Sequence, residues 1–354
     1  MRWGSLLVAM LLAARTAASA DPRATSCTMC HADAGIAGEA SPAIVEHEKS
    51  GAHATAGLSC HDCHGGNPDP ALAESLDAMD EKYTANPFRG APTRVDIPGF
   101  CGRCHSDPTL MRRFQPSGRV DQERQYWTSR HGELLKQGDA KVATCVDCHG
   151  THGILPPADI ESPVYPRRVA ETCSRCHSDA ARMAGYRLPD GRPLPVDQYA
   201  RWRHSVHAEF LLAREDTSAP TCNDCHGNHG AQPPGLESVT FACGQCHARE
   251  AELFRASPKE AAFESHRKLL AGAGEAGCAD CHGNHGIERA TVAMLSPLPE
   301  TPCEFCHEPV GSGVSEAIEA SEGVQRHYET LRKGLLGQAA AEGLEGGARF
   351  DWLV

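Results

Sequence analysis

All eighteen cysteines of this chain fall into nine copies of the pattern Cys-x-x-Cys-His. Two thiols at this spacing can bond to the two vinyl groups of one porphyrin, and the histidine that follows can bind its iron. Zinc sites and disulfides also use paired cysteines, but neither requires histidine at the next position in every copy. The pattern therefore predicts nine covalent c-type haems and no cysteine left over.

The residues of this prediction follow from the pattern alone. The thioether bonds would form at Cys27, Cys30, Cys60, Cys63, Cys101, Cys104, Cys145, Cys148, Cys173, Cys176, Cys222, Cys225, Cys243, Cys246, Cys278, Cys281, Cys303 and Cys306. The proximal iron ligands would be His31, His64, His105, His149, His177, His226, His247, His282 and His307.

The composition indicates how such a chain would fold. Aromatic residues make up 5% and hydrophobic residues 40%, while glycine and proline number 34 and 24. Side chains of this kind supply little apolar surface for a core, so the porphyrins would have to supply it. We expect a mainly α-helical protein with extensive loops, few or no β-strands, and a core packed with haem.

The motifs alternate between two kinds, which reveals an internal repeat. One kind has the form Cys-x-Asp-Cys-His, beginning at Cys60, Cys145, Cys222 and Cys278, and its last three copies continue as His-Gly-x-His-Gly. The plain kind lacks that aspartate and begins at Cys27, Cys101, Cys173, Cys243 and Cys303. A helix-like stretch with one histidine separates each plain motif from the next aspartate motif. The chain thus reads as four and a half copies of one unit.

Apolar periodicity and capping residues predict where the helices lie. Helical stretches are expected over Val120 to Gly138, over Pro195 to Glu215, from Ser257 onward, and over Ser312 to Gly343. We divide the chain into a signal peptide at 1–20, an N-terminal unit at 21–120 with haems 1 to 3, and repeated units at 121–354. The last of these would carry haems 4 to 9 and a C-terminal helix.

Histidines outside the motifs are candidates for the sixth iron ligand. The helix stretches hold His47, His131, His207, His266 and His327, and the His-Gly loops hold His152, His229 and His285. Recurrence at equivalent places favours iron ligation over a surface role for these eight. The first aspartate motif lacks the loop histidine, so the ninth ligand would be His61 or His53. The alternatives there are a methionine or lysine ligand, or an open iron. His204 is expected to be a surface residue.

The first twenty residues predict export. Arg2, a short apolar run and the small residues Ala18-Ser19-Ala20 have the form of a secretory signal peptide with its cleavage site. We therefore expect a periplasmic protein, with an extracellular location as the alternative. The net charge of −12 argues against nucleic acid as a partner. Membrane association would be peripheral at most.

The recurring unit, with Ser-x-His before Cys-x-Asp-Cys-His-Gly-x-His-Gly, resembles the periplasmic multihaem cytochromes c of anaerobic, metal- or nitrogen-respiring bacteria, over about residues 27 to 330. These are grouped with cytochrome c3-like proteins. The resemblance implies electron transfer along bis-histidine haems, with redox partner proteins such as a membrane b-type cytochrome or a quinol-oxidising complex.

Three functions are compatible with these observations. The leading one is a non-enzymatic electron carrier with nine haems in an anaerobic respiratory chain. The second is a multihaem reductase with one open iron, acting on a small nitrogen or sulfur oxyanion. The third is a subunit of an extracellular cytochrome filament. The number of six-coordinate irons distinguishes the first from the second.

Overall fold

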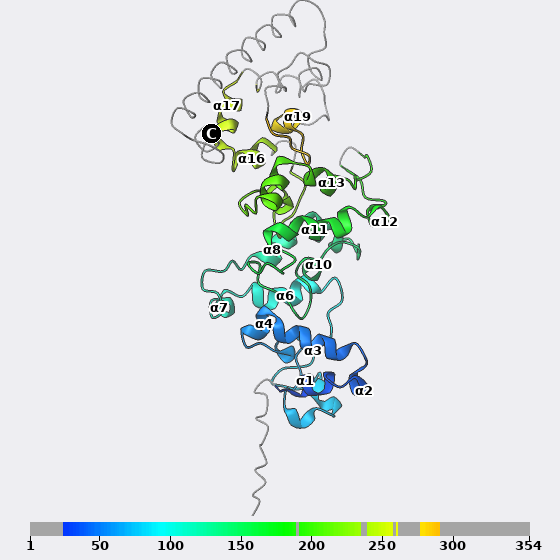
Figure 1. Ribbon diagram of the computed structural model, residues 1–354. Helices are drawn as coiled ribbons and strands as arrows, with labels where there is room; N and C mark the ends of the chain where they lie inside the picture. Colours follow the sequence, from blue (N-terminus) through cyan, green and yellow to red (C-terminus); the bar gives the residue numbers. More distant parts are fainter. Residues whose placement is uncertain (1–23, 189–190, 235–238, 258–259, 261–276, 291–354) are drawn as a thin grey trace, which may run out of the picture. The chain divides into compact units, whose positions relative to one another are not determined.

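The computed structural model describes residues 24–188, 191–234, 239–257, 260 and 277–290. These residues form short helices, turns and loops (Figure 1). No strand occurs among them, and one isolated bridge joins Arg187 to Pro193. The prediction of a mainly helical, loop-rich fold is confirmed for this part of the chain. None of the described helices is long and apolar enough to cross a membrane.

The chain divides into two compact units. The first comprises residues 1–120 and 144–162, and the second comprises 121–143 and 163–354. The helices of the first unit are α1 (Ser26–His31), α2 (Ala34–Ala37), α3 (Ser41–Ser50), α4 (Ala52–Thr55), α5 (Cys60–His64), the 3₁₀ turns η1 (Pro70–Leu72) and η2 (Leu76–Met79), α6 (Ile97–His105), α7 (Pro108–Met111) and α10 (Cys145–His149).

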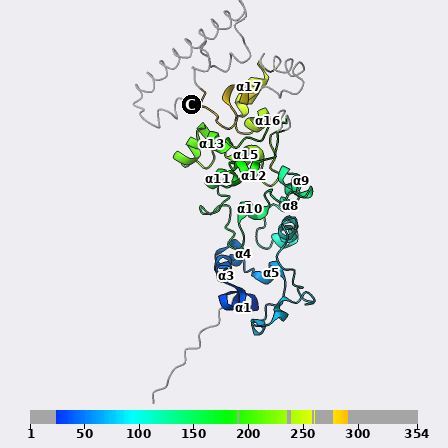
Figure 2. The ribbon, with the colours of Figure 1, turned by 90° about the vertical axis from the view of Figure 1, so that its right-hand side faces the viewer.

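The second unit is built in the same way from short elements. They are α8 (Gln122–Tyr126), α9 (Arg130–Lys136), α11 (Pro166–His177), α12 (Ala180–Met183), α13 (Gln198–Arg203), α14 (Val206–Ala208), the π-helical turn η3 (Glu209–Ala213), α15 (Cys222–His226), α16 (Val239–Gly244), α17 (Ala248–Arg255) and α19 (Cys278–His282). In both units, helices that carry consecutive attachment motifs pack together, as α6 with α10 (Figure 1) and α11 with α15 (Figure 2).

Two of the expected long helices are each broken by a serine. The stretch from Val120 to Gly138 ends one helix at Tyr126 and begins another after Ser129, whose hydroxyl accepts the Gly132 N–H at 2.9 Å. Serine is a preferred N-cap because its oxygen satisfies an N–H of the first helical turn that has no partner within the helix. Each break therefore starts a new helix just before a histidine.

The second break has the same form. The helix α13 ends at Arg203, and Ser205 caps α14, accepting the Ala208 N–H at 3.2 Å. The consequence is that His131 and His207 lie in the first turn of new helices, rather than in the middle of long ones.

The apolar core of the described residues is small. In the second unit, one cluster joins Ala170, Trp202, Ala208 and Leu211, and another joins Tyr126, Leu135 and Val142. Leu211 is fully buried. These clusters fix α11, α13 and α14 together, and α8 with α9, close to the candidate iron ligands.

Several predictions concern residues outside the described part of the chain. They are the signal peptide at 1–20, the helix from Ser257 onward beyond its first residue, the helix at 312–343, and the residues His266, Cys303, Cys306, His307 and His327.

Candidate haem sites

The four aspartate motifs form isolated five-residue helices that begin at the first cysteine and end at the histidine. In each, the aspartate is the third helical residue, and its carboxylate accepts the backbone N–H of the residue before the helix. The four bonds are Ser59 to Asp62 at 2.7 Å, Thr144 to Asp147 at 2.7 Å, Thr221 to Asp224 at 2.8 Å and Gly277 to Asp280 at 2.5 Å. This is half of a capping box, and it explains why aspartate recurs there.

Two of the plain motifs need no such aspartate because their cysteines lie inside longer helices. The motif at Cys101 ends the nine-residue helix α6, and the motif at Cys173 ends the twelve-residue helix α11. The first plain motif forms the short helix α1, which has its own capping box between Thr25 and Thr28. These three plain motifs are thus either capped or extended.

Glycine follows each aspartate motif because the chain leaves the helix in a left-handed conformation. Gly150 has φ +80° and donates to the Val146 carbonyl, which ends α10. The second glycine of the loop lies against the neighbouring repeat: a Cβ added at Gly153 would stand 2.9 Å from the His47 carbonyl oxygen. The His-Gly-x-His-Gly sequence therefore turns the chain out of one attachment helix and brings it against another segment.

Consecutive motifs come close enough for their first cysteines to affect one another. The pairs are Cys27 with Cys60, Cys101 with Cys145, Cys173 with Cys222, and Cys243 with Cys278. A hydrogen bond with Cys101, together with burial, raises the pKa of the Cys145 thiol. Each pair joins the plain motif and the aspartate motif of one repeat.

The second cysteines of the motifs come close to one another between one repeat and the next. Burial, and then the nearby Cys104 thiol, raise the pKa of Cys63 to about 11. Burial also raises the pKa of Cys225, with a smaller contribution from Cys246. Within each unit, attachment motifs that follow one another in sequence are therefore neighbours in space.

Among the described residues, imidazole rings oppose each other in at least five pairs, and each of these five pairs joins a motif histidine to a histidine outside the motifs. The ring centroids lie 6.0 Å apart for His53–His105, 6.3 Å for His64–His152, 6.0 Å for His131–His177, 6.3 Å for His207–His247 and 6.0 Å for His226–His285. An iron held between two imidazoles would separate their centroids by about 6 Å, since a metal–nitrogen bond is about 2 Å long. The spacing of all five pairs matches that value.

The protonation of these rings suits metal binding. Each of the five pairs contains at least one histidine whose pKa is lowered, chiefly by burial. These histidines are His53, His105, His152, His177, His207 and His285. A lowered pKa keeps the imidazole neutral, which is the form that binds a metal.

Backbone carbonyls orient two of the motif histidines. Nδ1 of His64 lies 2.9 Å from the Gly90 carbonyl oxygen, and Nδ1 of His226 lies 3.1 Å from that of Gln232. A hydrogen bond at Nδ1 leaves Nε2 as the nitrogen available to a metal.

The other histidines named from the sequence lie elsewhere. His47 is exposed on α3 and contributes to the lowered pKa of His152. His61 lies within α5, where its Nδ1 is buried without a hydrogen-bond partner among the described residues. His229 is half-buried in the loop after α15. Of the two candidates for the ninth ligand, only His53 therefore faces a motif histidine within the described residues.

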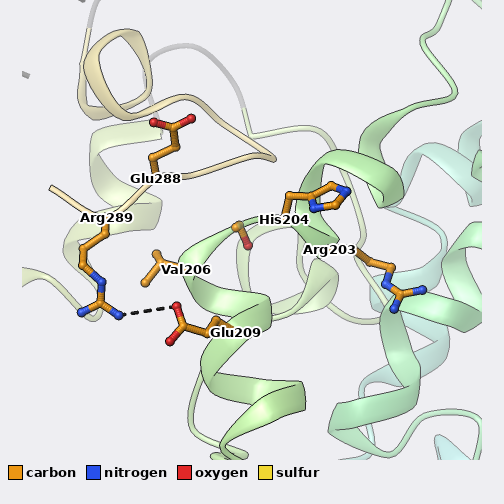
Figure 3. A pocket seen from close by; sticks show the side chains of 7 residues that line it. Arg203, His204, Val206, Glu209, Glu288 and Arg289 are labelled. Atoms are coloured by element: carbon orange, nitrogen blue, oxygen red, sulfur yellow. Dashed lines mark ion pairs between the residues drawn. The ribbon is translucent and has the colours of Figure 1, made fainter. Parts of the chain in front are cut away.

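A pocket of about 370 Å³ lies beside α14, and His204 is exposed on its wall (Figure 3). Its lining includes Glu209 and Arg289, whose charged groups face each other at 3.6 Å. The position of His204 matches the expectation of a surface residue.

Comparison with known proteins finds multihaem cytochromes among the relatives of this chain. A family model described as cytochrome c3 matches residues 214–308. The chain is 25% identical over 240 residues to the multihaem cytochrome MtrA of Shewanella baltica, covering 58% of this chain and 67% of that protein. It is 22% identical over 219 residues to the c-type polyhaem cytochrome OmcB of Geobacter sulfurreducens, covering 57% of this chain and 25% of that protein. The chain thus spans only a quarter of the length of OmcB. No solved structure matches it.

The site and these relatives together support a multihaem c-type cytochrome. The residues present fit covalent haem: motif cysteines are gathered in neighbouring pairs, and imidazoles are opposed at the spacing of an iron between them. Multihaem relatives support electron transfer as the general activity.

Proposed function

We propose that this chain is an electron-transfer protein that carries nine covalent haems, most of them with two histidine ligands, in an anaerobic respiratory chain. The observation that carries the proposal is the set of five opposed imidazole pairs with centroids 6.0 to 6.3 Å apart. Two histidines on one iron leave no position for a substrate, and they favour a low reduction potential. When bound, each haem would supply a one-electron iron couple.

The protein's own residues would hold, order and shield the attachment sites. The capped helices would fix the cysteines, and the carbonyls of Gly90 and Gln232 would orient His64 and His226. The close approach of successive motifs, seen at Cys101 with Cys145 and Cys63 with Cys104, would set consecutive haems side by side. A series of near neighbours is what stepwise electron transfer through a protein requires.

The proposed distal ligands fall into two groups. His53, His131, His152, His207 and His285 are proposed from geometry and sequence together. His47, His229, His266 and His327, and His61 as the other candidate for the ninth ligand, are proposed from sequence position alone.

The setting is proposed from the sequence. The signal-peptide pattern at 1–20 supports a periplasmic location, because a chain with that leader would be exported. The acidic balance of −12 supports redox partner proteins that present a basic surface. A membrane b-type cytochrome or a quinol-oxidising complex would be a suitable electron donor.

The spin state of the ferric protein tests the proposal. If all irons have two strong ligands, the optical and electron paramagnetic resonance spectra of the oxidised protein should be wholly low-spin. Addition of nitrite, hydroxylamine or cyanide should then produce no rapid change. A high-spin signal near one ninth of total iron, lost when such a ligand is added, would instead favour a reductase with one open site.

A further inference from the structure

A backbone hydrogen bond that recurs three times joins neighbouring repeats. The N–H of Ala52 donates to the Ile154 carbonyl at 2.7 Å, that of Arg130 to Ala231 at 3.1 Å, and that of Val206 to Ile287 at 2.8 Å. In each case the donor stands one residue before a helix histidine, and the acceptor stands two residues after a loop histidine. We call this bond the docking bond. It satisfies an N–H of the first helical turn that the helix itself cannot satisfy.

The docking bond marks equivalent positions in the first three repeats, independently of the number of residues between their motifs. It places His53 in the first repeat where His131 and His207 stand in the second and third. All three lie in the first turn of a short helix, after the N-cap residues Gly51, Ser129 and Ser205. His47 lies on the preceding helix α3. His53 is therefore the structural equivalent of the helix histidines of the later repeats.

The helix histidines face forward along the chain. His53, His131 and His207 oppose His105, His177 and His247, the motif histidines of the next plain motif. Each of these ring pairs lies within one unit.

The loop histidines face backward. His152 opposes His64, and His285 opposes His226, the motif histidine of the preceding aspartate motif in each case. None of these five pairs joins two histidines of the same repeat.

We infer that this chain uses a crossed ligand arrangement, in which a histidine of the adjoining repeat completes each of these five haem sites. The helix histidine serves the next plain haem, the loop histidine serves the preceding aspartate-motif haem, and His53 fills the helix role in the first repeat. This inference rests on the proposed function, because it requires haem at the motifs. It goes further by assigning particular ligands to particular haems.

The docking bond explains how two ligands stay in register. It fixes the loop backbone next to the first turn of the helix, so the loop and helix histidines form one structural element. Close approach depends on the second loop glycine at Gly153, where an added Cβ would lie 2.9 Å from the His47 carbonyl oxygen. At Gly286 the distance to the Arg201 carbonyl oxygen is 3.5 Å, which is an ordinary contact. At α14, Arg289 adds an ion pair with Glu209 at 3.6 Å and stacks on the Phe210 ring at 5.6 Å.

Methionine substitution tests the assignment of His53 without leaving an iron open. His53→Met in the full holoprotein should create one methionine–iron charge-transfer band and raise the potential of one haem. The matched control His204→Met, at an exposed histidine that is not among the proposed ligands, should give no such band. A band from His204→Met, or none from His53→Met, would overturn the alignment.

Removing one haem at a time tests which iron His53 serves. With Cys101→Ser and Cys104→Ser, which delete the haem of His105, His53→Met should give no band. With Cys60→Ser and Cys63→Ser, which delete the haem of His64, the band should remain. The opposite pattern, or a band that survives both deletions, would overturn the crossed arrangement.

The second unit provides an independent copy in case a deletion variant of the first unit does not fold. His207→Met should give a band that disappears with Cys243→Ser and Cys246→Ser and persists with Cys222→Ser and Cys225→Ser. Failure of the proposed function would be visible separately, as a haem count or a ferric spin state of the unaltered protein that differs from prediction. A correct count and spin state with the wrong band pattern would overturn the crossed arrangement alone.

Discussion

The guanidinium of Arg94 lies 2.6 Å from the carboxylate of Asp147, the residue that caps the attachment helix α10. The same carboxylate accepts the Thr144 backbone N–H and hydroxyl at 2.7 and 2.9 Å. Hydrogen bonds from Thr144 and Arg94 hold the pKa of Asp147 below its usual value even though burial opposes this. Asp147 thus links the start of an attachment helix to a segment 53 residues earlier.

Removal of the Asp147 carboxylate should destabilise the protein more than removal of the Asp224 carboxylate, which occupies the same position in α15. Asp224→Ala should lower the free energy of unfolding by about 1 kcal/mol, the usual cost of a lost helix cap. Asp147→Ala should cost about 1 kcal/mol more, because it also removes the ion pair with Arg94. Thermal unfolding of the holoprotein followed by circular dichroism measures both, with the exposed Glu39→Ala as control. Equal losses for all three variants would contradict a capping role.

The glycines that end the attachment helices should differ in their tolerance of alanine. Gly150 has φ +80° with no atom within 4 Å of an added Cβ, so Gly150→Ala should cost about 1 kcal/mol for the left-handed backbone alone. Gly65 has φ +74°, and its Cβ would lie 2.0 Å from the Pro87 carbonyl oxygen. Gly65→Ala must therefore also shift the backbone and should destabilise the protein more. Denaturant unfolding compares the two, and a smaller effect at Gly65 would contradict the packing seen there.

Leu211 should be the most sensitive apolar position of its cluster. It is fully buried against Trp202 and Ala208, and Leu211→Ala should lower the free energy of unfolding by about 2 to 5 kcal/mol. Leu253 is 62% exposed, and Leu253→Ala should change stability by less than about 0.5 kcal/mol. Similar effects at both positions would show that this cluster does not support the fold.

A tyrosine–carboxylate pair should make stability depend on pH. Tyr186 donates to Asp139 at 2.5 Å, which lowers the pKa of Asp139, while burial and this bond raise the pKa of Tyr186 to about 12. The neighbouring charges are Lys141, which lies over the Tyr186 ring, and Arg182.

The lowered aspartate pKa contributes stability above about pH 4 that is lost as pH falls through the folded-state value. The raised tyrosine pKa contributes stability below about pH 10 that is lost as pH rises towards 12. Tyr186→Phe should therefore reduce the unfolding midpoint between these limits and have less effect outside them. The control is Tyr199→Phe, which keeps the ring stacked on Trp202. If Tyr186→Phe lowered the unfolding midpoint by the same amount at every pH, the result would contradict this linkage.

The local chemistry of the sites could be predicted from the sequence because it depends on residues close together in the chain. The helical, loop-rich fold followed from composition, and the recurrence of aspartate within the motifs marked a position that the capping bonds at Asp62 and Asp224 explain. The repeat pattern predicted His131 and His207 as candidate distal ligands, but it did not predict that they oppose His177 and His247.

The partner of each distal histidine could not be predicted because it depends on backbone contacts between repeats. The number of residues before the aspartate motif predicted His47 as the helix histidine of the first repeat. The docking bond from Ala52 to Ile154 instead makes His53 the equivalent of the later helix histidines. The signal that could have found it is the Ser-x-His sequence at Ser129 and Ser205, which marks an N-cap. Glycine replaces that serine at Gly51, so the pattern is hidden in the first repeat.

The number of covalent haems tests the central claim most directly. The mass of the intact, denatured protein and a pyridine haemochrome assay on the same sample should both return nine haems per chain, with no thiol available to an alkylating reagent. This result is predicted because every one of the 18 cysteines belongs to an attachment motif. A count of seven or fewer, or zinc in place of iron, would contradict the account.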